Sequence, residues 1–209
     1  LQESYGRIQK NKKITGLIIQ LPVPERLYIP EVLNAINPNI DVDCLTDINI
    51  GKLVMGTSWL TPPTPTAVME VLKNIKVDLR NKNVTIVGTG ALVGRPLAIM
   101  MANAGASVTT CNSRTNNTKE KCLAADIIVT AVGKKDLLRG DMVSPGTIVI
   151  DTGIAFDENG KMCGDANRAE VLEKASYLTP TPGGIGPITV ALLLRNVVLC
   201  AKKYLQKKS

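Results

Sequence analysis

The chain has 209 residues, of which 44% are apolar and 21% charged, enough to bury one good core or two modest ones. It contains no histidine, which excludes Ser-His and Cys-His catalysis and leaves Lys, Asp, Glu, Tyr or water for acid–base chemistry. Five widely spaced cysteines without a C-x-x-C pair argue against a zinc site and a disulfide framework, so we expect no metal and a reducing, cytoplasmic location.

The net charge of +7 comes partly from lysine runs at 10–13 and 202–208, for which solvated ends are a simpler interpretation than nucleic-acid binding. The longest apolar stretch, 188–200, is short and is interrupted by Arg195 and Asn196. We therefore expect neither a nucleic-acid partner nor a membrane span. The chain opens at Leu1 with a polar segment and no secretory signal, so we expect it to begin inside a larger gene product.

Residues 14–61 are expected to form one unit. A strand-like apolar run ends at Gln20, a proline-rich stop follows, and a helix near 30–36 leads into a polar loop at 37–47. Asp41 and Asp43 lie on one side of an extended segment because side chains alternate. Catalysis is one interpretation of these two carboxylates, and a loop cap with a turn residue is the other.

Three prolines within 61–65 mark a domain boundary, and a helix is predicted over 67–74. Farther along, short β-branched runs alternate with helical stretches. Strands are predicted over 84–87, 107–110, 127–131 and 147–150, with helices over 94–104 and 118–124 between them. This βαβαβ order predicts an α/β fold with a Rossmann-like parallel sheet, whose ligands bind beyond the carboxyl ends of the strands. We place this nucleotide domain at 62–187, and a second α/β catalytic domain at 1–61 plus 188–209, which contains most of a long helix over 189–203.

A glycine-rich turn, G-x-G-x-x-x-G over 88–94, directly follows the first of these strands and opens a helix. It is one residue longer than the usual dinucleotide fingerprint, but the strand–turn–helix setting favours nucleotide binding over a plain tight turn. Arg95 in the first helical turn opposes the helix dipole, which a phosphate partner would explain. The second strand ends near Ser113 and Arg114 without a carboxylate. This favours NADP over NAD, unless Arg114 simply points into water.

The run 179–189 places prolines and glycines directly before the last helix. Glycine lets a ligand approach the main chain and proline fixes φ, so this turn is either a ligand clamp or a tight connection without a ligand.

Taken together, these segments closely resemble the bifunctional methylenetetrahydrofolate dehydrogenase/methenyltetrahydrofolate cyclohydrolase family over almost the whole chain. The motifs occur in order and are 16–24 (GLIIQLPVP), 40–43 (IDVD), 61–65 (TPPTP), 148–154 (IVIDTGI), Gly164-Asp165 and 182–187 (PGGIGP). The resemblance implies an oxidoreductase and hydrolase of one-carbon metabolism that works as a homodimer. Its two steps are hydride transfer from methylenetetrahydrofolate to NADP and hydrolysis of the methenyl product to formyltetrahydrofolate.

The resemblance also implies two groups of site residues. Asp43 would bind the pterin ring through its N–H donors, and Gln20 would orient the catalytic lysine and the one-carbon bridge, so these two are the catalytic candidates. The substrate-binding candidates are Gln20, Leu21, Pro22, Asp43, Pro182, Gly183, Gly184, Pro187 and Thr189. The resemblance places Gly88, Thr89, Gly90, Ser113 and Ile154 at the cofactor, and the turn and strand ends add Val93, Gly94, Arg95, Arg114, Thr115, Ala131, Val132 and Gly133.

Several positions depart from the family pattern. Thr89-Gly90 replaces Arg-Ser or Ala-Ser, which removes a phosphate partner and keeps NAD open as the acceptor, and the family's Gly after Asp43 is Cys44. The family's upstream Tyr-x-x-x-Lys helix is not in this sequence, because Tyr5 and Lys10 have the wrong spacing. We therefore expect an N-terminally truncated catalytic domain that binds ligands better than it turns them over. An NAD-dependent dehydrogenase alone and a catalytically dead folate- or nucleotide-binding module are the alternatives.

Overall fold

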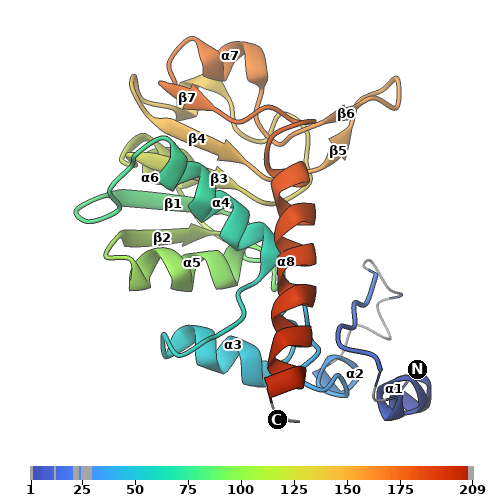
Figure 1. Cartoon of the computed structure of the whole chain (residues 1–209). Coiled ribbons are helices and arrows are strands. Elements are labelled where there is room, and N and C mark those ends of the chain that lie inside the picture. Colours follow the sequence, from blue (N-terminus) through green and yellow to red (C-terminus); the bar gives the residue numbers. More distant parts are fainter. Residues whose placement is uncertain (1, 12, 21–23, 25–29, 207–209) are drawn as a thin grey trace. The chain divides into compact units, whose positions relative to one another are not determined.

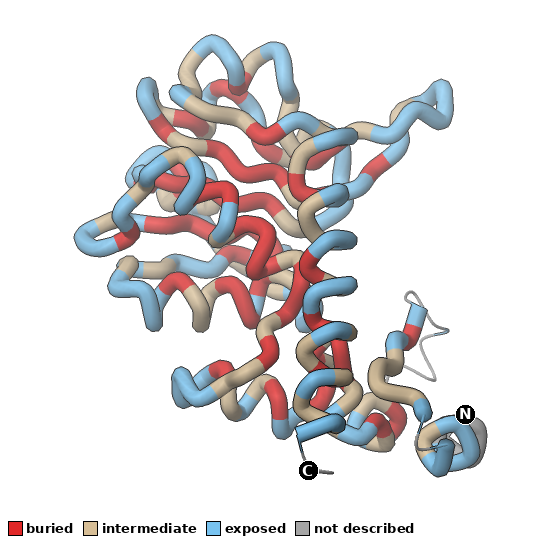
Figure 2. The backbone as a smooth tube through the Cα atoms, viewed as in Figure 1, coloured by how far each residue is buried: buried red, intermediate tan, exposed pale blue. Residues whose placement is uncertain are grey.

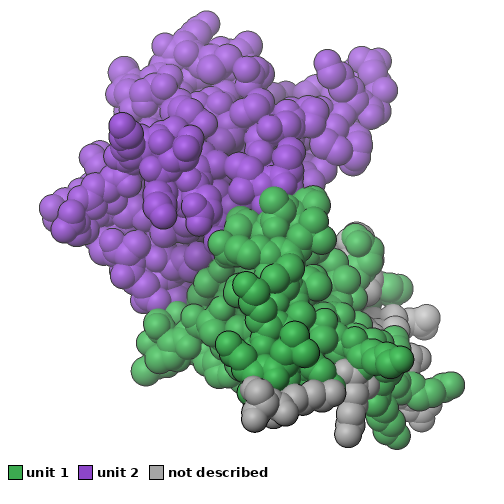
Figure 3. Space-filling model, in the orientation of Figure 1, with its two compact units in different colours: residues 1–63, 190–209 green, residues 64–189 purple. Residues whose placement is uncertain are grey.

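The computed structural model describes residues 2–11, 13–20, 24 and 30–206 (Figure 1). The chain divides into two compact units (Figure 3). Unit 1 comprises Leu1–Pro63 with Val190–Ser209, and unit 2 comprises Thr64–Thr189.

A five-stranded parallel sheet forms the centre of unit 2, in the order β2-β1-β3-β4-β7. The strands are β1 (Asn83–Val87), β2 (Ser107–Cys111), β3 (Ile127–Thr130), β4 (Ile148–Asp151) and β7 (Tyr177–Leu178). The β-branched runs of β1 and β3 are buried almost throughout, as strands covered on both faces must be (Figure 2). The predicted parallel α/β sheet is confirmed.

The strand order of this sheet reverses at β1. β1 pairs with β2 on one side and with β3 on the other, so successive connections leave it in opposite directions. Open α/β sheets bind ligands beyond the carboxyl ends of their strands at such a switch point. We therefore expect a ligand site where the loops after β1 and β3 begin.

Short helices and a hairpin complete unit 2. The helices are α4 (Pro63–Asn74), α5 (Gly94–Asn103), α6 (Thr118–Leu123), the 3-10 turn η2 (Gly140–Met142) and α7 (Arg168–Leu172), and the hairpin pairs β5 (Ala155–Phe156) with β6 (Met162–Cys163). One core cluster joins Cys122 of α6 and Val171 of α7 to Val87, Ile128 and Val149 of the sheet. The crossover helices therefore hold the strands in register by burying apolar side chains against them.

Unit 1 differs from its sequence-based expectation at two places. The strand expected to end at Gln20 is reduced to an isolated parallel bridge between Leu17 and Asp41, and Ile18 is 47% exposed. The expected polar loop is followed by the unpredicted helix α3 (Asp47–Val54), whose N-cap Thr46 accepts a hydrogen bond from the backbone N–H of Asn49. The helices α1 (Gln2–Lys10) and α2 (Pro30–Leu33) complete the N-terminal part.

The last helix, α8 (Ile185–Gln206), starts four residues before its predicted beginning at 189. By length and composition alone it is also long and apolar enough to cross a membrane. Within unit 1, however, its buried Asn196 donates from Nδ2 to the carbonyl oxygens of Val42 (2.8 Å) and Thr61 (2.9 Å). Cys200 packs with Val42 in the same core cluster, as in a helix that belongs to a protein core.

Candidate active site

Every cofactor-binding candidate lies at the carboxyl edge of the sheet in unit 2 or in the first turn of the helix that begins there. The loops follow β1 (88–93), β2 (112–115), β3 (131–134) and β4 (152–154), and the proline- and glycine-rich turn at 179–184 follows β7. Parallel strands end on the same side of a sheet, so residues far apart in sequence meet at one edge.

The glycine-rich turn after β1 leaves no room for a side chain at two of its positions. A Cβ on Gly88, whose φ is +115°, would lie 2.3 Å from the carbonyl oxygen of Ala131, and one on Gly94 would lie 1.8 Å from the carbonyl oxygen of Gly88. The turn therefore packs against the first residue after β3 and against the start of α5. Gly90 between them has open space around it. This close-packed turn at a helix N-terminus fits the pyrophosphate of a dinucleotide.

The loop after β2 is held by its own hydrogen bonds. The backbone N–H of Arg114 donates to Oδ1 of Asn112 (2.9 Å), and the N–H of Asn112 donates to Oγ1 of Thr115 (2.9 Å). Ser113 and Arg114 are exposed. A preformed turn that presents a hydroxyl and a guanidinium to solvent can hold a phosphate group at little cost in ordering.

The turn at 179–187 is also fixed by its backbone. The peptide bond between Thr181 and Pro182 is cis, and Gly183 has a φ of +94°. A Cβ on Gly184 would lie 2.3 Å from the carbonyl oxygen of Pro180. Pro182, Gly183 and Pro187 are exposed, so the turn presents its outer side to solvent.

In unit 1 the structure brings the segments of Gln20 and Asp43 side by side. The bridge between Leu17 and Asp41 is parallel, so Gln20 and Asp43 both follow it in the same direction. Gln20 is exposed, rather than a polar group at the end of a buried strand as the sequence suggested. Leu21 and Pro22 lie outside the described residues.

Asp41 is the anchor of the Asp43 loop. Its buried carboxylate accepts hydrogen bonds from the backbone N–H groups of Leu45 (3.0 Å) and Thr46 (2.9 Å), from Oγ1 of Thr46 (2.8 Å) and from Nδ2 of Asn49 (2.9 Å). Asp43 itself is half-buried. Burial and the nearby Asp41 charge raise the pKa of Asp43 to about 6. Asp41 thus has the structural role in this loop.

Residues 62–205 match the family model of the tetrahydrofolate dehydrogenase/cyclohydrolase NAD(P)-binding domain. The chain belongs to the tetrahydrofolate dehydrogenase/cyclohydrolase family. This confirms the resemblance of the sequence motifs. The bifunctional protein FolD of Aliarcobacter butzleri is 43% identical over 202 residues, which make up 97% of this chain and 70% of that protein.

Two solved structures of the family share this fold. The bifunctional FolD methylenetetrahydrofolate dehydrogenase/cyclohydrolase of Campylobacter jejuni matches 97% of this chain and 72% of its own, with a TM-score of 0.93 and 40% identity. The FolD of Trypanosoma brucei, solved with NADP cofactor and inhibitor, matches 98% of this chain and 72% of its own, with a TM-score of 0.92 and 33% identity.

The family's glycine after Asp43 has a physical explanation in this structure. Cys44, which replaces it, has a φ of +57°, the left-handed conformation in which glycine is favoured. The Cys44 side chain is buried beside Val42, Leu60 and Cys200. Burial and the neighbouring Asp41 and Asp43 charges raise the pKa of the Cys44 thiol far above its usual range, so this thiol is not a nucleophile.

Sequence reasoning assigned no role to two buried carboxylates at the edge of this family's cofactor domain, Asp151 and Asp165. The signal was present, because Asp151 closes the otherwise apolar strand β4 and Asp165 follows a glycine. Burial raises the pKa of Asp165, although hydrogen bonds from three backbone N–H groups act in the opposite direction.

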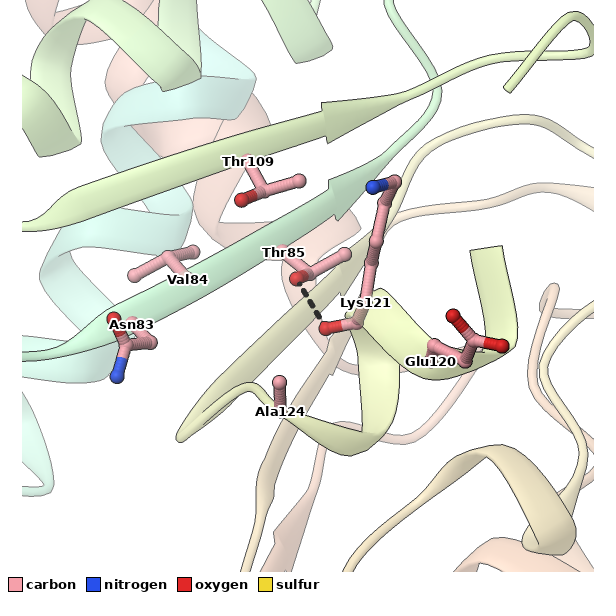
Figure 4. A pocket seen from close by; sticks show the side chains of 7 residues that line it. All are labelled: Asn83, Val84, Thr85, Thr109, Glu120, Lys121 and Ala124. Carbon is pink, nitrogen blue, oxygen red and sulfur yellow. Dashed lines mark hydrogen bonds between the residues drawn. The ribbon is translucent and has the colours of Figure 1, made fainter. Parts of the chain in front are cut away.

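A separate cavity of about 380 Å³ lies elsewhere in unit 2 (Figure 4). It is lined by the first residues of β1, by Thr109 of β2 and by α6, and Oγ1 of Thr85 donates a hydrogen bond to the carbonyl oxygen of Lys121 (2.8 Å). None of its lining residues is a site candidate. The position of the strand ends, and not the size of this cavity, therefore locates the candidate active site.

Proposed function

We propose that the protein oxidises methylenetetrahydrofolate to the methenyl form with NADP, and that the same fold hydrolyses the methenyl form to formyltetrahydrofolate. The observation that carries this proposal is the tight Gly88–Gly94 turn at the switch point of a cofactor domain of this family. Asp43 and Gln20, on adjacent segments of unit 1, are the folate-binding side chains that the motifs imply.

The cofactor is proposed to lie along the carboxyl edge of the sheet. The turn at 88–94 and the start of α5 hold the pyrophosphate, and the loops after β3 and β4 flank the nicotinamide half. When bound, the dinucleotide supplies the hydride acceptor. The protein aligns the two ligands, a role that requires no histidine.

NADP is proposed over NAD because the loop after β2 offers a hydroxyl and a guanidinium. Ser113 and Arg114 are exposed on a turn that is held by Asn112 and Thr115. The opposing observation is Thr89-Gly90, which provides no cation for a 2′-phosphate. An NAD-dependent dehydrogenase is therefore the second candidate function, and cofactor titration distinguishes the two.

The hydrolytic step depends on residues that the family motifs place upstream of Gln20. The chain spans about 70% of the length of the Aliarcobacter butzleri relative. In the family pattern a Tyr-x-x-x-Lys helix supplies the catalytic lysine, and loss of a general acid–base group typically costs about a hundredfold to ten-thousandfold in rate. We expect slow or undetectable turnover by the 209-residue chain and full activity when that helix precedes it.

The test is oxidation of methylenetetrahydrofolate followed by absorbance of the methenyl product, with NADP and with NAD. The 209-residue chain is compared with a version extended upstream by the family's Tyr-x-x-x-Lys segment. Turnover in the extended version alone supports the enzyme and assigns the chemistry to that segment. Cofactor binding without turnover in either version would replace this proposal with a ligand-binding module.

We also propose a cytoplasmic location and a homodimer. All five cysteines are free thiols, which fits a reducing compartment. The two compact units are proposed to be the folate and cofactor domains expected from the sequence. Analytical ultracentrifugation of the purified chain tests the dimer, because a monomer at micromolar concentration would contradict it.

A further inference from the structure

The buried carboxylate of Asp165 fixes the backbone of the loop after β3. This carboxylate, which is 0% exposed, accepts hydrogen bonds from three consecutive backbone N–H groups, those of Val132 (2.7 Å), Gly133 (2.8 Å) and Lys134 (2.7 Å). Three successive amides that turn toward one anion form a nest and fix the path of the backbone. Val132 and Gly133 remain exposed on the outer side of that loop.

Asp151 connects this loop to its neighbours. Its carboxylate accepts from Oγ1 of Thr130 at the end of β3 (2.9 Å) and from the N–H of Gly153 in the loop after β4 (2.9 Å). It also accepts from the N–H groups of Asp165 (3.1 Å) and Ala166 (2.9 Å). Asp151 therefore fixes the segment that contains Asp165, and Asp165 in turn fixes the loop after β3.

The network reaches the turn after β7 as well. The backbone N–H of Asp151 donates to Oγ1 of Thr179 (2.8 Å), the buried residue that opens that turn. Loops after three strands, β3, β4 and β7, thus share one hydrogen-bonded centre. Within the part of the chain that the structure describes, the hydrogen bonds of these two carboxylates do not reach the loops after β1 and β2.

Two glycines make room for these carboxylates. A Cβ on Gly153 would lie 2.1 Å from Cγ of Asp165, and a Cβ on Gly164 would lie 2.0 Å from Oδ2 of Asp151. Any other residue at either position would displace a carboxylate from its N–H donors. The two buried carboxylates therefore require glycine at both positions, because the packing around them leaves no room for a Cβ atom.

The position of the pair relative to the switch point indicates which half of the ligand it serves. In doubly wound folds the pyrophosphate binds at the helix after β1 and the adenosine ribose binds at the end of β2. The nicotinamide half then lies on the other side, over β3 and β4. We propose that Asp151 and Asp165 are positioning residues, which fix the loops around the nicotinamide half of the dinucleotide without touching the ligand. This inference rests on the proposed cofactor site.

The experiment compares two ligands by isothermal titration calorimetry at a temperature where each variant is folded. One ligand is the oxidised dinucleotide NADP, and the other is 2′,5′-ADP, which contains the adenosine half only. For Asp165→Asn, which turns an acceptor into a donor facing N–H groups, we expect the Kd for NADP to rise about tenfold. We expect the Kd for 2′,5′-ADP to stay within about twofold, because its loops are outside the network.

Two further variants keep the test decisive. Thr130→Val removes the hydroxyl that donates to Asp151 without changing side-chain shape, and it should shift NADP binding in the same direction if Asp165→Asn does not fold. Asp126→Asn is the matched control, because its carboxylate accepts from the N–H of Asn83 (2.8 Å) at the amino end of the same sheet. It should change neither affinity.

Equal weakening of both ligands would show a general loosening of the domain and overturn the proposal. Unchanged NADP binding in both Asp165→Asn and Thr130→Val would overturn it too. Selective loss of NADP affinity, together with a version extended upstream that does not oxidise methylenetetrahydrofolate, would support the positioning role and reject the proposed reaction. A wild-type chain that binds 2′,5′-ADP but gains nothing from the nicotinamide half would reject the positioning role alone.

Discussion

At the scale of single residues, the partly buried carboxylate of Asp43 lowers stability when it is ionised, and the same carboxylate is proposed to bind folate. Burial and the Asp41 charge raise the pKa of Asp43 to about 6, so the ionised form is disfavoured in the folded protein. A carboxylate that accepts the N–H donors of a pterin must nevertheless be ionised. Ligand binding and stability should therefore respond to pH in opposite directions through this one side chain.

Folate affinity should fall as the pH drops through 6. Asp43 becomes protonated in the free protein below its pKa of about 6, so the Kd for 5-formyltetrahydrofolate, used as a stable folate, should rise by up to about tenfold per pH unit. Calorimetric titrations between about pH 5 and 7.5 measure this. Asp43→Asn should bind about 10-fold to 100-fold more weakly at pH 7.5 and lose this pH dependence. A wild-type Kd that is flat over the range would contradict the assignment.

The same substitution should stabilise the protein. Because the pKa of Asp43 is higher in the folded state than in the unfolded state, its stabilising contribution is present below about pH 4 and is lost as the pH rises through about 6. Asp43→Asn removes that loss and should add about 1 kcal/mol at pH 7.5, a figure reduced for solvent screening. Urea unfolding at pH 4 and 7.5 tests this, with a gain expected only at the higher pH.

At the scale of elements, helix α4 ends in a left-handed residue that is not glycine. The N–H of Lys76 donates to the carbonyl oxygen of Lys73 (3.0 Å), and the N–H of Val77 donates to that of Leu72 (2.9 Å), the two bonds of a Schellman motif. Lys76 has a φ of +59°. A lysine in this conformation is strained by its Cβ.

Lys76→Gly should therefore stabilise the protein. Relief of the strain exceeds the extra chain entropy of glycine, so we expect a gain of about 0.5 kcal/mol in the free energy of unfolding. Lys73→Gly, the same change within the last turn of α4, should instead cost about 1 kcal/mol. Urea unfolding of both variants measures the difference. Equal losses would show that the left-handed conformation of Lys76 is not maintained in solution.

The turn between β1 and α5 should not accept a methyl group at Gly94. The added Cβ would lie 1.8 Å from the carbonyl oxygen of Gly88, so the turn must shift. We expect Gly94→Ala to cost about 3 kcal/mol and to abolish NADP binding measured by calorimetry. Gly90→Ala is the matched control, because nothing lies within 4 Å of its Cβ, and its stability should stay within about 0.5 kcal/mol. Normal NADP binding by Gly94→Ala would exclude this turn from the cofactor site.

At the scale of the whole molecule, helix α8 contributes residues to both compact units, and Asn196 ties it to unit 1. Asn196→Ala leaves the carbonyl oxygens of Val42 and Thr61 without this donor, which should cost about 2–4 kcal/mol. The single tryptophan, Trp59, lies in unit 1 with Nζ of Lys203 3.6 Å from its ring centroid, so its fluorescence reports this unit.

The expected result is a Trp59 fluorescence transition at lower urea concentration in Asn196→Ala. NADP binding, which we propose for unit 2, should be kept at urea concentrations below that transition. Val198→Ala, a truncation at a 52% exposed position of the same helix, should shift the transition by less than about 0.5 kcal/mol. An unshifted transition in Asn196→Ala would contradict the anchoring role.

Local sequence patterns predicted four of the five strands of the parallel sheet, but neither β7 nor the β5–β6 hairpin. The β-branched runs of β1, β2, β3 and β4 and the glycine turn after β1 were predicted to within a residue or two, because their signals are local. A continuous apolar run indicates a strand that is covered on both faces. A turn that requires glycine has the glycine within its own short segment of sequence. The motifs identified the family for the same reason, since each is a short contiguous segment.

The roles of residues whose partners are distant in sequence became visible in the folded chain, because local patterns do not show long-range contacts. The apolar run at 14–20 is typical of a buried strand, yet among the described residues it forms one isolated bridge, between Leu17 and Asp41, and Ile18 is exposed. The sequence pattern around Asp165 is typical of a loop. In the fold, however, its carboxylate accepts hydrogen bonds from backbone N–H groups more than thirty positions earlier in the chain. Local pattern fixes what a segment can form, but long-range contacts decide which of its polar groups are buried and which ligand-facing loops they hold.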